Sequence, residues 1–114
     1  MAISGEKYRQ IGRAAAGAVT VVTTRDRTTN AVIGLTVSSF VTLSFDPPLV
    51  MFAIQHDASS YPAIVATREF GVSLLAANQV DVARRFAVKG AEKGAGVELQ
   101  AGEVLAVPLI ANAL

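Results

Sequence analysis

Two runs rich in β-branched residues constrain the fold more than any other feature of the sequence. They are AVTVVTT (18–24) and LTVSSFVTLSF (35–45), and the segment between them is typical of a turn. We expect both runs to be strands, the second ended by the Asp-Pro-Pro at 46–48 because proline cannot donate to a strand ladder. The apolar run LVMFAIQ (49–55) predicts a further strand, buried on both faces.

Three stretches predict helices inserted between strands. They are residues 4–16, YPAIVAT (61–67) and NQVDVARRFAV (78–88), the last with Asn78 as its expected cap. FGVSLLA (70–76) predicts another strand.

The remaining segments carry weaker signals. KGAEKGAG (89–96) predicts a loop, and residues 97–114 are weakly patterned. We therefore expect one domain spanning 1–114, mainly β with inserted helices, in which a sheet curls into a small barrel. The four clear strands are too few to close such a barrel.

Composition excludes several classes of function. The formal net charge is +1 with no basic run, so no nucleic-acid footprint is present, and no apolar run reaches membrane-spanning length. The absence of cysteine and the single histidine argue against a metal site and fit a cytoplasmic protein. A hydrophobic content of 52% in 114 residues favours a homodimer that buries the excess.

The run 35–45 offers a candidate binding strand. Strict alternation places hydroxyl side chains on one face and an apolar set on the other, which we expect to pack inward. The hydroxyl face carries Thr36, Ser38, Thr42 and Ser44 with Phe40, and the inward face carries Val37, Val41, Leu43 and Phe45 with Ser39. Thr36 to Ser39 could hydrogen-bond the edge and ribityl chain of a flavin, but an ordinary solvated strand face explains the same pattern and is more common.

Two further groups allow both a binding and an ordinary interpretation. Ser59 and Ser60 precede the predicted helix 61–67, where they could hold a phosphate or cap the helix. Arg85 and Phe86 lie near the end of the helix 78–88, where they could contact a flavin or its phosphate. In the ordinary interpretation Arg85 is solvated and Phe86 packs on the apolar side of the helix.

The order of these segments resembles a known family. YRQIGRAAAGAVTVVTT, GLTVSSFVTLSFDPPLVMFAI, SSYPAI, FGVSLLAANQVDVARRFA and KGAEKGAGVEL follow one another from about residue 8 to the end. Together they resemble the flavin reductase-like family with the FMN-binding split β-barrel, above all the reductase components of two-component flavin monooxygenases. The last strands of that family, with a Gly-Asp-His segment, are not in this sequence, so we expect the barrel to be incomplete at the C-terminus.

The resemblance implies an NAD(P)H:flavin oxidoreductase. It would bind FMN, with FAD as the alternative, and pass hydride from NADH or NADPH to flavin N5, supplying a monooxygenase. The family pattern carries over to Thr36, Val37, Ser38 and Ser39 for the flavin, Ser59 and Ser60 for its phosphate, and Arg85 and Phe86 near either. It designates no catalytic residue. A non-catalytic FMN-binding module and a structural dimeric remnant are the alternatives.

Overall fold

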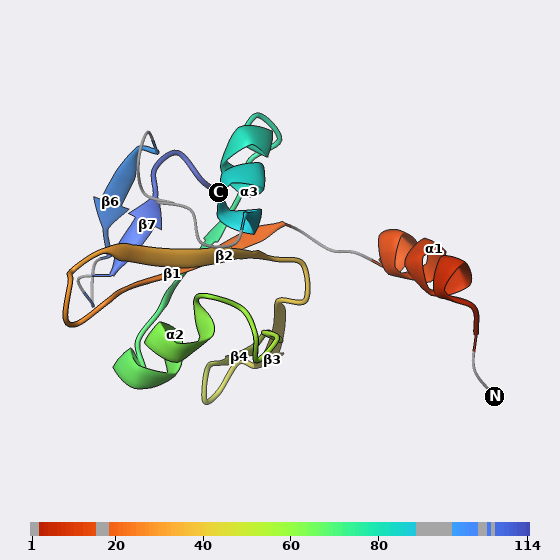
Figure 1. Cartoon of the computed structure of the whole chain (residues 1–114), viewed down its shortest axis with the longest axis horizontal. Coiled ribbons are helices and arrows are strands. Elements are labelled where there is room, and N and C mark those ends of the chain that lie inside the picture. Colours follow the sequence, from red (N-terminus) through yellow and green to blue (C-terminus); the bar gives the residue numbers. More distant parts are fainter. Residues whose placement is uncertain (1–2, 16–18, 89–96, 103–104, 106) are drawn as a thin grey trace.

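The computed structural model describes residues 3–15, 19–88, 97–102, 105 and 107–114 (Figure 1). The predicted loop 89–96 lies outside these residues, as does the start of the predicted strand at 18. The elements in chain order are α1 (Gly5–Ala15), β1 (Thr20–Arg25), β2 (Val32–Val37), β3 (Val41–Ser44), β4 (Leu49–Met51), α2 (Tyr61–Thr67), β5 (Gly71–Leu74), α3 (Val80–Ala87), β6 (Leu99–Ala101) and β7 (Pro108–Ile110).

Strand β1 is the centre of the molecule. It pairs antiparallel with β2 on one side and with β5 on the other, while β3–β4 and β6–β7 form two separate hairpins. In Figure 1, α2 and β3–β4 lie on one side of β1 and β2, and α3 and β6–β7 lie on the other; α1 stands apart. The described fold is thus mainly β with inserted helices, as predicted, and shows no closed barrel among the described strands.

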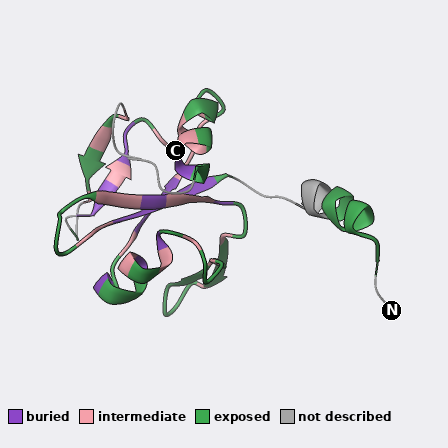
Figure 2. Ribbon diagram, in the orientation of Figure 1, coloured by how far each residue is buried: buried purple, intermediate pink, exposed green. Residues whose placement is uncertain are grey.

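Both faces of β1 are buried because each face meets a different hydrophobic cluster. Val21 packs with residues of α3 and β7, and the neighbouring Val22 packs with residues of β2 and α2. Figure 2 shows the buried residues concentrated along this strand and the elements that cover it. Successive side chains of a strand point to opposite faces, so two adjacent valines suffice to serve two cores.

The threonines of β1 are as buried as its valines, and each hydroxyl has a partner. Thr20 donates to the backbone carbonyl of Val37 at 2.9 Å, and the Thr23 hydroxyl donates to the carbonyl of Pro108. The Thr24 hydroxyl lies 3.1 Å from that of Thr67. A buried hydroxyl without a partner would cost about 1–3 kcal/mol, so these bonds allow polar residues in a core strand.

The predicted turn between β1 and β2 is confirmed, and Asp26 closes it. The Asp26 carboxylate accepts hydrogen bonds from the backbone N–H groups of Thr28 (2.8 Å) and Thr29 (3.0 Å). The bonds from Thr29 and Thr28 lower the pKa of the Asp26 carboxyl from its ordinary value. Asn30 completes the turn at φ 60°, a conformation that asparagine tolerates well.

The prediction of one strand over 35–45 is wrong. Strand β2 ends at Val37 and β3 begins at Val41, because the chain bends between them. At the bend the Ser39 hydroxyl accepts a hydrogen bond from the backbone N–H of Ala53 at 3.0 Å, which links the segment to the chain beyond β4. The alternation of faces therefore does not continue through the bend.

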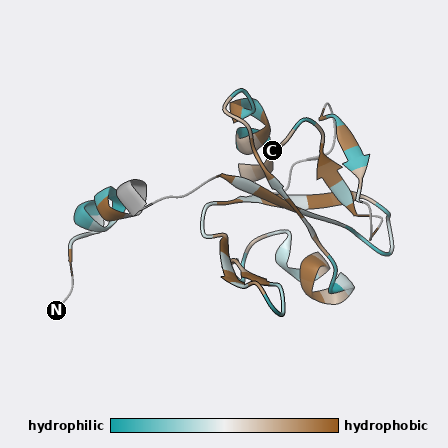
Figure 3. Cartoon of the chain, turned by 180° about the vertical axis from the view of Figure 1, so that it is seen from behind, coloured by the Kyte–Doolittle hydropathy of each residue, from teal (hydrophilic) through white to brown (hydrophobic). Residues whose placement is uncertain are grey.

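The predicted burial of the β3 and β4 side chains is also wrong. Leu43 and Phe45 are 58% and 97% exposed, although the alternation predicted that they pack inward. Only Leu49–Met51 of the run 49–55 forms a strand, and all three residues are exposed because β4 pairs with β3 alone. Figure 3 shows this hairpin as a strongly hydrophobic segment at the edge of the molecule.

The three helices are confirmed, but the cap of α3 differs from the prediction. Gln79, not Asn78, occupies the cap position, and its side chain accepts from the backbone N–H of Ala76 (2.8 Å) and donates to the carbonyl of Ala111 (2.9 Å). None of the described helices is long and apolar enough to span a membrane. The hairpin β6–β7 lies within residues 97–114, where the sequence showed only a weak pattern.

Gly34 permits the closest packing around β2, which makes it a test of the fold. A Cβ atom at Gly34 would lie 2.8 Å from Cε1 of Phe86 and 2.9 Å from the carbonyl oxygen of Val22. We expect Gly34→Ala to lower the free energy of unfolding by about 2 kcal/mol, because neither the buried ring nor the backbone can yield without strain. Urea denaturation followed by circular dichroism measures the change.

Gly5→Ala is the matched control, because a Cβ atom at Gly5 meets nothing within 4 Å. It should change the free energy of unfolding by less than about 0.5 kcal/mol. Equal effects of the two substitutions would contradict the packing described around β2.

Candidate binding site

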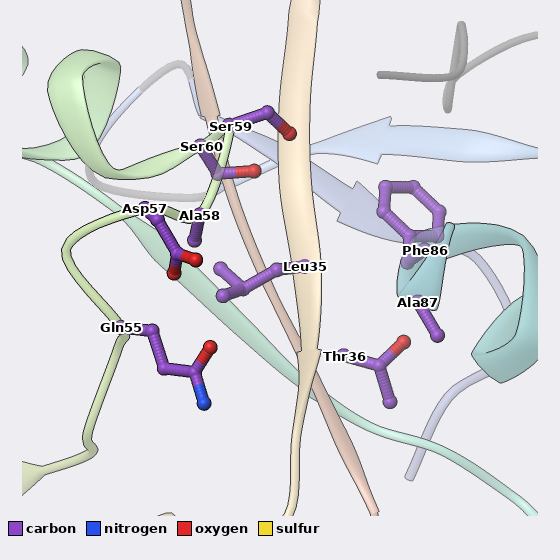
Figure 4. Close-up of a pocket in the computed structure, with 9 residues that line it drawn as sticks. All are labelled: Leu35, Thr36, Gln55, Asp57, Ala58, Ser59, Ser60, Phe86 and Ala87. Carbon is purple, nitrogen blue, oxygen red and sulfur yellow. The ribbon is translucent and has the colours of Figure 1, made fainter. Parts of the chain in front are cut away.

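A pocket of about 300 Å³ lies where β2, the loop before α2 and the end of α3 meet (Figure 4). Its wall combines apolar side chains with hydroxyl, amide and carboxylate groups. The residues that line it are Leu35, Thr36, Gln55, Asp57, Ala58, Ser59, Ser60, Phe86 and Ala87. A volume of this size is at the lower end of the range for small-molecule sites.

The outer edge of β2 forms one side of the pocket. Among the described strands β2 pairs only with β1, and the carbonyl of Gly34 is directed away from β1, where it accepts a hydrogen bond from Ser60. Alternate peptide groups of an antiparallel strand point the same way, so the N–H and C=O of Thr36 face this edge too. The pocket therefore offers backbone donors and acceptors in addition to side chains.

The Ser60 hydroxyl holds the loop before α2 against β2. It donates to the Gly34 carbonyl at 2.8 Å, and the residue is 2% exposed. Ser60 is the N-cap residue of α2, but its side chain makes no capping hydrogen bond. Ser60 therefore occupies the cap position without the side-chain capping hydrogen bond considered for it, and its hydroxyl instead bonds to the neighbouring strand.

The loop itself presents donors to the pocket. Within the described part of the chain, the backbone N–H groups of Ser59 and Ser60 make no hydrogen bond. The Ser59 side chain is exposed, and Figure 4 shows its hydroxyl directed past Ser60 toward β2. These groups can donate to an oxygen atom of a ligand.

Helix α3 closes the opposite side. The Thr36 hydroxyl donates to the carbonyl of Ala83 at 2.6 Å, which connects β2 to the helix. Phe86 lines the pocket from behind: its side chain is 0% exposed because it packs against Gly34 and joins Val21 and Ile110 in one core cluster. Phe86 therefore shapes the wall, while its ring faces remain in the core.

The structure brings four of the eight predicted site residues to this pocket and leaves four outside its lining. Thr36, Ser59, Ser60 and Phe86 line the pocket, although Thr36 lies 23 or more positions before the other three. The residues outside the lining are Val37, which is buried in the core, Ser38, which is exposed, Ser39, which bonds to Ala53, and Arg85, which is half-buried on α3.

Other lining residues were not predicted from the sequence. Gln55 was assigned to a buried strand and Asp57 to a polar loop, yet both side chains point toward the same space beside Leu35 in Figure 4. A polar residue that ends an apolar run and is followed by a polar loop is the signal that could have indicated Gln55. Asp57 is the one charged residue among those lining the pocket.

The arrangement suits a ligand that is partly aromatic and partly polar. Leu35, Ala58 and Ala87 supply apolar contact, and the edge of β2 and the loop supply hydrogen bonds. Among the described residues no group of three or more His, Cys, Asp or Glu side chains gathers as metal ligands do.

Comparison with known proteins identifies relatives along nearly the whole chain. Residues 12–114 match the model of the flavin reductase like domain. The chain is 38% identical over 112 residues to the NADH:riboflavin 5'-phosphate oxidoreductase of Streptomyces pristinaespiralis, covering 98% of this chain and 63% of that protein. It is 34% identical to the flavin-dependent monooxygenase reductase subunit HsaB of Mycobacterium tuberculosis, covering 91% of this chain and 54% of HsaB.

Solved structures agree with these sequence relatives. The NADH:FAD oxidoreductase SgcE6 of Streptomyces globisporus, in complex with NAD and FAD fragments, superposes with a TM-score of 0.82 at 32% identity. That match covers 99% of this chain and 68% of SgcE6. The chain thus spans between half and two thirds of the length of the curated relatives described here.

The Ser60–Gly34 hydrogen bond can be tested by a pair of neighbouring substitutions. Ser60→Ala should lower the free energy of unfolding by about 1–3 kcal/mol, because it leaves the Gly34 carbonyl without this buried donor. Ser59→Ala removes the same atom from an exposed side chain and should change it by less than about 0.5 kcal/mol. Thermal and urea denaturation measure both, and equal losses would contradict the role of Ser60.

Proposed function

The chain belongs to the flavin reductase-like domain family, and from that membership we propose that it is an NAD(P)H-dependent flavin reductase. It binds FMN, with FAD as the alternative, and the reduced flavin is supplied to a monooxygenase. Its relatives include NADH oxidoreductases of flavins, which favours NADH as the electron donor. The observation that carries the proposal is the meeting of Thr36 with the Ser59–Ser60 loop in one pocket.

The residues of the pocket offer the kinds of polar and apolar groups that a flavin needs. The outward N–H and C=O of Thr36 match the donors and acceptors along the edge of an isoalloxazine ring. Leu35 and Ala87 offer apolar contact to the ring, and the N–H groups of Ser59 and Ser60 suit its polar side chain. The volume, about 300 Å³, accommodates part of a flavin, so the rest must lie outside the pocket.

The protein's contribution is orientation. A bound flavin supplies the redox chemistry by accepting hydride from the nicotinamide at N5. The edge of β2 fixes the ring relative to the sheet, and the bond from Thr36 to Ala83 keeps α3 against that edge. Fixing two reactants in one geometry is a large part of what an enzyme supplies for a transfer between them.

A second copy of the chain fits the exposed hairpin β3–β4. Its apolar side chains are between 43% and 97% exposed: Val41, Leu43, Phe45, Leu49, Val50 and Met51. Contiguous apolar surface of this kind marks an interface in soluble proteins. A homodimer would cover it, in agreement with the high apolar content.

Flavin binding and reduction can be measured directly. We expect titration with FMN to quench flavin fluorescence, and addition of NADH under argon to bleach the visible flavin absorbance at a rate that saturates with NADH. Ser59→Trp should weaken FMN binding at least about tenfold, because the indole fills the pocket from an exposed position. Ala66→Trp, exposed on α2 and outside the lining, is the matched control and should bind as the unmodified chain does.

Three outcomes separate the alternatives. Binding with saturable bleaching supports the reductase. Binding without bleaching by NADH or NADPH favours a non-catalytic flavin-binding module. No binding of any flavin contradicts the proposal and leaves a structural dimeric remnant.

The dimer has its own test. Sedimentation velocity should show a dimer for the unmodified chain and a shift to monomer for the double substitution Leu43→Ser, Phe45→Ser, because these are the most exposed apolar residues of the hairpin. Val80→Ser, on the exposed side of α3, controls for loss of surface hydrophobicity elsewhere. A monomer at every concentration would contradict this assignment of the hairpin.

A further inference from the structure

Three of the polar side chains that line the pocket can only accept a hydrogen bond from a ligand. The Ser60 hydroxyl donates its proton to Gly34, and the Thr36 hydroxyl donates its proton to Ala83. A hydroxyl has one proton and two lone pairs, so both can only accept a hydrogen bond from a ligand. The carboxylate of Asp57 also only accepts, and it carries the one formal charge among the lining side chains.

Such a wall discriminates between a flavin side chain that ends in a hydroxyl group and one that ends in a phosphate. The ribityl chain carries hydroxyl groups, which donate to these acceptors. A terminal phosphate is dianionic near neutral pH, offers few protons and is repelled by a carboxylate. Its available donors are the N–H groups and hydroxyl of the loop and the amide of Gln55, with no basic side chain among the described lining residues.

We propose that Asp57 is a specificity-determining residue: its charge weakens binding of the flavin phosphate, so that riboflavin binds at least as tightly as FMN. The inference rests on the proposed flavin site and adds which class of flavin the site prefers. Asp57 is exposed, has no hydrogen-bond partner among the described residues and points toward Gln55 and Leu35 in Figure 4. Its charge therefore faces the pocket and is not balanced by an ion pair among the described residues.

The expected size of the effect is modest because water reaches the pocket. Two charges about 4 Å apart in water interact by an energy equivalent to roughly a fivefold change in affinity, and salt reduces it. We expect Asp57→Asn to lower the Kd for FMN about three- to tenfold and to leave the Kd for riboflavin within about twofold. Asparagine keeps the size and one acceptor oxygen, removes the charge and replaces the other oxygen with an NH2 donor, so the salt dependence of the change separates the charge from the added donor.

Riboflavin and FMN differ only by the phosphate, so titrating the full chain with each flavin measures the contribution of the phosphate to the Kd. Asp81→Asn is the matched control: it removes the same charge from an exposed position at the start of α3, outside the lining, and should leave the ratio of the two Kd values unchanged. Raising the salt from about 0.05 M to about 0.5 M should also narrow the difference that Asp57→Asn produces, since the Debye length falls severalfold.

The outcomes are distinct. Tighter binding of FMN than of riboflavin by the unmodified chain, or an equal change of both Kd values in Asp57→Asn, would overturn the role of Asp57 and leave the flavin site intact. The same gain from Asp81→Asn would show a long-range charge effect and would also overturn it. Failure of both flavins to bind would instead contradict the proposed function on which the inference rests.

Discussion

The packing of Phe86 against the backbone of Gly34 holds the two halves of the structure together at β2. A side chain at Gly34 would collide with the ring, so the absence of one allows α3 to approach the strand. The carbonyl of Gly34 also accepts a hydrogen bond from the Ser60 hydroxyl, which holds the loop before α2 against β2. One position thus fixes both walls of the pocket, and the geometry of the site is inseparable from the packing of the core.

The sequence predicted elements well where the chain is buried by its own neighbours. Residues 20–24 of AVTVVTT became the central strand because these two valines and three threonines are all buried beneath covering elements. The prediction of burial failed at 41–45 and 49–51, where the described structure leaves the apolar residues exposed. Apolar patterning records that a residue is covered by something, but not whether the cover is the same chain. The hairpin β6–β7 lacked a pattern because it is short.

The site was partly predictable for a related reason. Ser59 and Ser60 were indicated together, yet one is exposed and the other is bonded to a strand 26 positions earlier in the chain. Sequence neighbours cannot show which hydroxyl keeps its proton for a ligand, since that depends on which carbonyl lies beside it in space. Asp57 was visible as a polar loop residue, but only the fold directs its carboxylate into the space beside Leu35.

An open strand edge is ordinarily a liability, because its unpaired backbone groups can pair with another chain. Here the edge of β2 beyond Gly34 is what gives a ligand access to the N–H and C=O of Thr36, so covering it with a further strand would remove the binding surface. The loop before α2 and helix α3 flank this edge and, together with β2, line the pocket of about 300 Å³. The same arrangement that protects the edge from pairing therefore defines the pocket.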